Sequence, residues 1–260
     1  MALPGAQAAM RCGCSGTAVD RQCPACGHTG LRALVTGAGR TAEELGRAFP
    51  AVPVMTSGRA EILSRVPGTP AVVVATPGAE PRAEGGYAAA VLLDGWALLG
   101  RASLRAAEEA LRRWMNAAAL VRPAGDAGTV IVVADASLAA VQALVRWDPA
   151  TRAEHELAER RELRFPPAVS MASVAGPPDA VQELLSLVQL PAGAEMLGPV
   201  PVPAGAGQGG SSQENLRFLI RVPRPAGTAM AAALRAGQAL RSARKDAGSV
   251  RLQLDPAELI

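Results

Sequence analysis

Four cysteines are the residues of this sequence whose types and spacing are best suited to chemistry. Cys12, Cys14, Cys23 and Cys26 lie within fifteen positions, and the rest of the chain has no cysteine. Four thiolates are enough for a tetrahedral Zn²⁺ site, and the second pair, C-P-A-C-G, has the form of a zinc knuckle. The first pair is one residue closer than the usual spacing. Two disulfides or four unrelated thiols are the alternatives, and zinc is favoured if the thiols stay reduced.

The C-terminal segment is a second candidate site, because it is rich in arginine. Residues 217–260 hold seven Arg and one Lys against three acids, a net charge of +5, whereas residues 1–216 carry −2. A basic segment on a near-neutral body fits the binding of phosphate groups. On charge alone, a solvated arginine-rich helix face explains it equally well.

Several enzyme signatures are missing from the sequence. The only lysine is Lys245, so no P-loop lysine can contact a triphosphate, and no nucleophile elbow of the G-x-S-x-G type occurs. The two histidines, His28 and His155, lie far apart. Asp94 and Asp135 each follow an apolar run, where they are either site residues or helix caps.

The positions of these residues depend on an α/β arrangement. Apolar runs at 31–35, 52–55, 71–75, 88–93 and 129–134 predict strands, and the segments at 41–49, 59–66, 104–120 and 138–145 predict helices. The alternation favours a largely parallel sheet with strands buried on both faces. Ligands of such sheets lie at the carboxyl ends of strands, here residues 76–80 and 94–96.

A polar helix over 151–164 separates this layer from a second one. Strands are predicted at 169–174, 216–222 and 249–255, helices at 179–188 and 227–243, and a stiff turn at 196–201. In the strand 216–222, alternation places Arg217, Leu219 and Arg221 on one face. No signal peptide or membrane span is expected, so we expect a cytoplasmic protein of about two domains.

A series of short motifs, in a fixed order, resembles one family. They are RQCPACG (21–27), RTAEEL (40–45), FP (49–50) with VPV (52–54), LLD (92–94), RAAE (105–108), FPP (165–167), LGPVP (197–201) and LDP (254–256). The sequence resembles the C-terminal part of the primosomal protein N′ family, the replication restart helicases. Its divergent, alanine-rich sequence is similar to sequences of the actinobacterial branch of this family.

The resemblance implies a domain order. Residues 1–30 would be part of a zinc-ribbon-like insert, 31–150 a RecA-like second helicase lobe, 151–164 a linker helix and 165–260 a small α+β DNA-binding domain. The family's insert holds eight cysteines around two zinc ions. The four cysteines here would be half of each site, so they would either recombine around one Zn²⁺ or leave both sites incomplete.

The sequence departs from the family where ATP would be handled. The arginine motif Q-V-A-G-R-A-G-R corresponds to residues 116–123, where Leu120 and Pro123 replace its two arginines. Loss of such an arginine costs about 10³-fold or more in rate. The G-T-Q-M motif is reduced to A-T-P-G at 75–78, and Trp96 replaces an acid. We therefore expect no helicase or ATPase activity, although the family binds ATP.

The residues implied in DNA binding are retained better than those implied in ATP hydrolysis. By the resemblance, the candidate DNA-binding residues are Arg217, Arg221, Arg224, Arg241, Arg244 and Lys245, which would neutralise phosphates of forked or branched DNA. The implied partners are primosome proteins and single-strand binding protein. Two alternatives stay open. The chain is a lobe of an ATP-dependent 3′–5′ helicase completed by a missing N-terminal half, or a truncated interaction remnant with an exposed apolar face.

Overall fold

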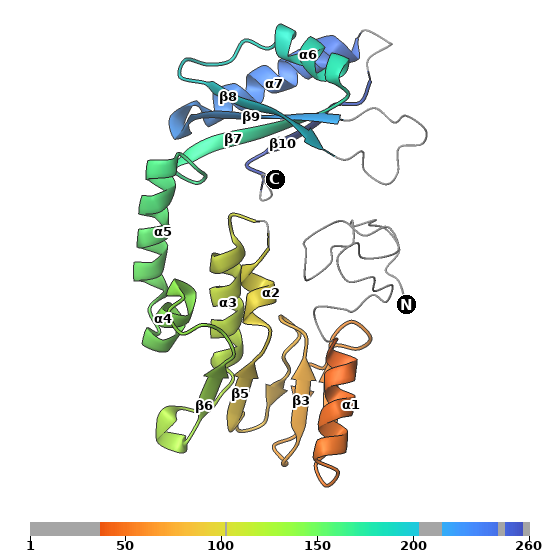
Figure 1. Ribbon diagram of the computed structural model, residues 1–260, viewed down its shortest axis with the longest axis vertical. Helices are drawn as coiled ribbons and strands as arrows, with labels where there is room; N and C mark the ends of the chain where they lie inside the picture. Colours follow the sequence, from red (N-terminus) through yellow and green to blue (C-terminus); the bar gives the residue numbers. More distant parts are fainter. Residues whose placement is uncertain (1–36, 102, 203–214, 244–247, 257–260) are drawn as a thin grey trace, which may run out of the picture. The chain divides into compact units, whose positions relative to one another are not determined.

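The computed structural model describes residues 37–101, 103–202, 215–243 and 248–256 (Figure 1). Contacts between residues divide these into two compact units, residues 37–162 and residues 163–256. Each unit has its own hydrophobic cluster.

Parallel strand pairs form the sheets of the first unit. The pairs are β1 (Val54–Ser57) with β3 (Val72–Ala75), β2 (Arg65–Val66) with β4 (Arg82–Ala83), and β5 (Ala89–Leu92) with β6 (Thr129–Val132). The helices are α1 (Ala38–Ala48), α2 (Gly95–Leu99), α3 (Ala106–Ala118), α4 (Ala139–Arg146) and α5 (Pro149–Leu163), with a short 3₁₀ turn, η1 (Ala124–Asp126). The predicted parallel pairing is therefore confirmed.

Among the residues that the structure describes, helices cover one face of the β5–β6 pair. Leu92 and Val132 pack against a cluster from α2, α3 and α4 that includes Leu111, Trp114 and Leu144. On the opposite face, Val91, Leu93, Ile131 and Val133 are each slightly more than half exposed. The expectation that these strands are buried on both faces was wrong, because this apolar face is half exposed in the described part of the chain.

The predicted helix at 59–66 is absent. The hydroxyl of buried Ser57 accepts a hydrogen bond from the Leu63 amide and donates one to the Ala79 carbonyl. Gly58 N–H donates to Glu61 O, so the segment forms a loop that leads into β2. A run of eight residues is too short to hold a helix against such competing local bonds.

The second unit is a single antiparallel sheet with two helices. Its elements are β7 (Val169–Gly176), α6 (Pro178–Leu187), β8 (Glu195–Val202), β9 (Asn215–Pro223), the 3₁₀ turn η2 (Arg224–Ala226), α7 (Gly227–Ser242) and β10 (Arg251–Leu254). The strand order β10-β7-β9-β8 and the succession β-α-β-β-α-β give a ferredoxin-like layout. This is the predicted small α+β unit.

Strand β8 replaces the turn that we predicted at 196–201. Its two prolines read as a loop signal, but β8 is an edge strand, where proline costs no ladder hydrogen bond. The pairing with β9 shifts register between Leu197 and Val200, around a cis Gly198–Pro199 peptide bond.

Both helices of this unit cover the same face of the sheet. The core contains Val174 of β7, Ile220 and Val222 of β9, Leu184 of α6 and Leu234 of α7, all almost fully buried. Figure 1 shows α6 and α7 on one side of the strands. Among the described residues, no helix packs on the other side, which we call the helix-free face.

Candidate nucleic-acid interface

The helix-free face carries every second residue of β9. Because Ile220 and Val222 point into the core, Arg217, Leu219 and Arg221 point the other way. The predicted grouping of these three side chains is therefore confirmed.

Strand pairing places Arg217 beside another arginine. Ala175 of β7 pairs with Arg217 of β9 on one side and with Arg251 of β10 on the other. The two arginines stand on strands about 10 Å apart, with the small alanine between them. Gln253 follows Arg251 on the same face, next to Ser173. The result is a basic row across the sheet.

Neither arginine of this row has an ion-pair partner among the described residues. Arg251 is exposed, and Arg217 is half-buried, with its Nε atom buried and without a hydrogen-bond partner in the described part of the chain. A buried donor without a partner is costly. The Arg217 guanidinium can therefore gain from an added oxyanion, and the exposed Arg251 guanidinium is accessible to the same kind of ligand.

A second basic group lies at the opposite end of the same face. Glu195, the first residue of β8, pairs across the sheet with Arg221 and lies on the same face. Its Oε2 accepts from Arg221 Nε and Nη2 at 2.7 Å, and its Oε1 accepts from Arg164. Hydrogen bonds from Arg221 and then Arg164 lower the pKa of Glu195 below its ordinary value. We call these three residues the Glu195 cluster.

Arg224 and Arg241, both predicted to bind DNA, have different environments. Arg224 is exposed in η2, and its Nη1 donates to the Pro167 carbonyl at 2.8 Å. Arg241 of α7 is only 2% exposed. It bonds Glu183 Oε2 at 3.1 Å and also donates to the Gly248 carbonyl. Its guanidinium holds the helix layer together, and we assign it to the core instead of the interface.

The remaining predicted site residues lie outside the described part of the chain. These are Arg244 and Lys245 and the four cysteines, Cys12, Cys14, Cys23 and Cys26. Among the described residues, no group of His, Cys, Asp or Glu could hold a metal ion. None of the described helices combines the length and apolar character that crossing a membrane requires.

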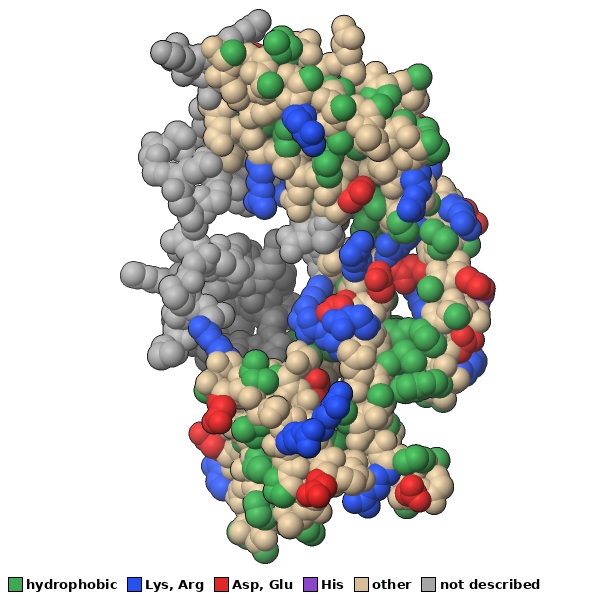
Figure 2. Space-filling view, turned by 180° about the vertical axis from the view of Figure 1, so that it is seen from behind, with side chains coloured by type: hydrophobic (Ala, Val, Ile, Leu, Met, Phe, Trp, Pro, Cys, Tyr) green, Lys and Arg blue, Asp and Glu red, His purple; other side chains and the backbone are tan. Residues whose placement is uncertain are grey.

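Two arginines of the helix-free face were missed from the sequence, Arg251 and Arg164. The final strand reads R-L-Q-L, an alternation that places Arg251 and Gln253 on one face, so its pattern could have revealed the first. Arg164 carries no such signal, because its role depends on the position of Glu195. Figure 2 shows Lys and Arg side chains scattered among acidic and hydrophobic ones.

The polar groups near the sequence-predicted ATP positions bond within the first unit. The Leu120 carbonyl accepts a backbone hydrogen bond from Tyr87, and Arg122 donates to the carbonyls of Gly85 and Gly86. In the loop after β3, both carboxylate oxygens of Glu80 accept from the Gly78 amide. These groups stabilise the unit's own loops.

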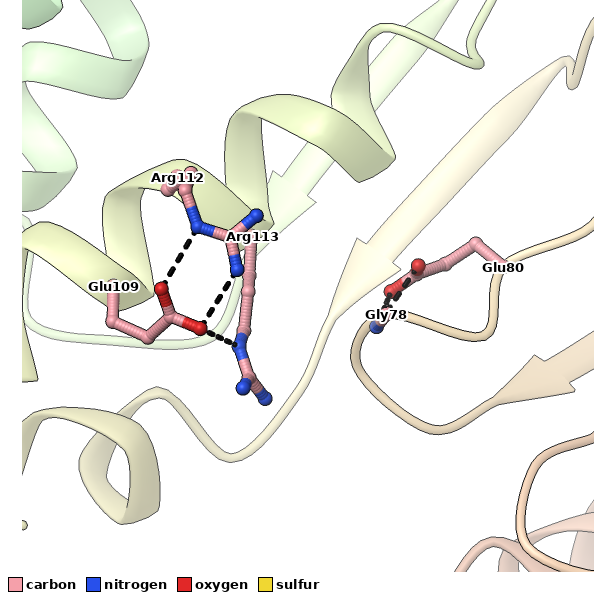
Figure 3. Close-up of polar contacts among 5 residues, drawn as sticks. All are labelled: Gly78, Glu80, Glu109, Arg112 and Arg113. Carbon is pink, nitrogen blue, oxygen red and sulfur yellow. Dashed lines mark hydrogen bonds and ion pairs between the residues drawn. The ribbon is translucent and has the colours of Figure 1, made fainter.

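The charged side chains of α3 are likewise paired with one another. Figure 3 shows Glu109 beside Arg112 and Arg113 on the same helix. Hydrogen bonds from Arg112 and Arg113 hold the pKa of Glu109 at about 2. Both arginines therefore already bind a carboxylate of their own helix.

Comparison with known proteins shows which proteins the chain resembles. Residues 161–257 match the family model of the primosomal protein N C-terminal domain. The chain is 53% identical, over 251 residues and 95% of its length, to the probable replication restart protein PriA of Mycobacterium leprae (strain TN). The chain corresponds to a PriA C-terminal portion. PriA of Mycobacterium tuberculosis (strain ATCC 25618 / H37Rv) is 50% identical over 248 residues, 92% of the chain. The chain spans 39% and 38% of these two PriA relatives.

Proposed function

We propose that this chain works in replication restart and primosome assembly by binding forked or branched DNA through the helix-free face. One observation carries the proposal: Arg217 and Arg251 stand in one row on a sheet face that no described helix covers. The similarity to PriA proteins supports the biological role. Primosome proteins and single-strand binding protein are the partners that this role implies.

The chemistry of the face favours contacts with the DNA backbone. Arginines bind phosphate oxygens in any sequence, so binding would be weakly sequence-specific. The only aromatic residue of β9, Phe218, packs against the core, and β7, β8 and β10 have none. Without aromatic platforms for stacked bases, tight binding of single strands is disfavoured. Duplex arms of a fork are the better ligand.

The proposal is tested by titrating a labelled forked duplex with the chain at several salt concentrations. Arg217, Arg224 and Arg251 have no carboxylate partner among the described residues, which predicts that affinity falls at least about 40-fold between 50 and 200 mM salt. Fluorescence anisotropy measures this directly. An affinity that is the same at both salt concentrations would exclude phosphate contacts as the source of binding.

A second candidate function is that of a helicase lobe. The parallel strand pairs are compatible with a RecA-like lobe, and the PriA relatives are much longer than this chain. We propose that the lobe does not hydrolyse ATP, because Leu120 and Pro123 replace arginines and the nearby polar groups are used internally. DNA-stimulated ATP hydrolysis by the purified chain would favour the helicase instead.

Zinc is the proposed cofactor. The donor set fits, because Cys12, Cys14, Cys23 and Cys26 supply the four thiolates that a tetrahedral zinc site needs. Recombination of these thiolates around one ion predicts one zinc per chain in metal analysis of the purified protein. Changing Cys23 to Ser should then release the metal, since affinity depends on the full ligand count. A wild-type chain purified with zinc available but containing none would rule the site out.

A further inference from the structure

The Glu195 cluster has the composition of an occupied phosphate site. Two guanidinium groups, from Arg164 and Arg221, converge on the two oxygens of one carboxylate. Paired arginines bind a carboxylate and a phosphate with the same fork geometry. We propose that Arg164 and Arg221 form a phosphate-binding site of the helix-free face, which Glu195 occupies until a phosphate of the DNA backbone replaces it. This inference rests on the proposed function.

The cluster is accessible enough for such an exchange. The side chains of Glu195 and Arg164 are 38% and 42% exposed, and that of Arg221 is 18% exposed. Ion pairs at this exposure are screened by water and contribute little to stability. A phosphate that brings further contacts with Arg217 and Arg251 can therefore displace the carboxylate at small cost.

The backbone at Arg164 gives an independent reason to assign it a specific role. Arg164 has a φ of 57°, in the left-handed region, immediately after α5. A glycine would adopt this conformation without strain, whereas a non-glycine residue there is uncommon. The strained position holds the start of the Arg164 side chain where it reaches Glu195 of the edge strand β8.

Glu195 thereby lowers the affinity of the face for DNA. Its carboxylate neutralises one of two arginines and would repel an incoming phosphate. Replacing it with the isosteric amide should free both guanidinium groups. We expect Glu195→Gln to bind the forked duplex about tenfold more tightly at 50 mM salt and to steepen the slope of log K against log salt by about 0.9, the value for one added phosphate contact.

A matched control removes one carboxylate from the other side of the same unit. Asp179 is exposed in the first turn of α6, on the covered face of the sheet. Asp179→Asn changes the net charge equally and should leave the salt slope unchanged. A purely structural role for the cluster predicts weaker or equal binding in Glu195→Gln, so a gain in affinity separates the two accounts.

The double variant Glu195→Gln/Arg164→Ala should lose the gain in fork affinity. Thermal melting of each variant establishes that it is folded.

Inorganic phosphate, exchanged for chloride at constant ionic strength, distinguishes the source of the phosphate. If free phosphate competes with the fork more strongly in Glu195→Gln than in the wild type, the site takes any phosphate; if not, it takes the DNA backbone.

Equal slopes for Glu195→Gln and Asp179→Asn, with fork binding still dependent on Arg217, would overturn the cluster proposal alone. If neither the wild type nor any variant binds the forked duplex, the proposed function itself is overturned.

Discussion

Changing Arg217 and Arg251 together to alanine is expected to weaken binding to a forked duplex about 100-fold at 50 mM salt, because each removed phosphate contact loses its counterion-release contribution. The slope of log K against log salt should become shallower by about 1.8. The side chains stand on the strand surface and outside the core cluster, so the unit should stay folded. Anisotropy titrations at four salt concentrations measure both quantities.

Arg235 provides the control for this double variant. It is an exposed arginine of α7, on the covered side of the sheet, and it has no ion-pair partner among the described residues. Arg235→Ala should change fork affinity less than about threefold, through net charge alone. Equal losses in both proteins would show that binding follows total charge and not the helix-free face.

Changing Arg241 to alanine is expected to destabilise the second unit by about 2–4 kcal/mol, since it removes one member of a buried ion pair and leaves a cavity. The side chain is almost fully buried between α7, Glu183 and the Gly248 carbonyl. Hydrogen exchange of α7 amides should become faster by the same free energy. Fork binding by the remaining folded protein should keep its wild-type salt slope.

The chain's own aromatic residues supply an internal control for this experiment. Tyr87, Trp96, Trp114 and Trp147, its only tyrosine and tryptophans, all lie in the first unit. Their fluorescence transition on unfolding should therefore not move in Arg241→Ala, and Arg235→Ala should change stability by less than about 0.5 kcal/mol. If Arg241→Ala instead makes the slope of log K against log salt shallower and leaves hydrogen exchange of the α7 amides unchanged, Arg241 contacts DNA.

The sequence predicted the elements whose pattern is local. The alternation in 216–222 identified β9 and the shared face of Arg217, Leu219 and Arg221, since strand periodicity depends on few residues. The Ala-rich segment 227–243 likewise identified α7 to within one residue at its end. In these segments, local preference and tertiary packing agree.

Errors arose where tertiary contacts decide. Arg241 belongs to a basic segment, but its helix position turns it inward, which charge counting cannot detect. The prolines of β8 led to the prediction of a turn, because a strand tolerates proline only at the edge of its sheet and the sequence does not show which strand is at the edge. The Glu195 cluster joins residues 31 and 26 positions apart. Its existence follows from strand register, which a single sequence does not reveal.

The central claim is that the helix-free face contacts DNA, and arginine modification tests it most directly. The chain is treated with phenylglyoxal with and without the forked duplex, and modified peptides are quantified by mass spectrometry. The account predicts that DNA protects Arg217 and Arg251 and leaves Arg235 as reactive as before. Protection of Arg235 together with unchanged reactivity of Arg217 and Arg251 would contradict it.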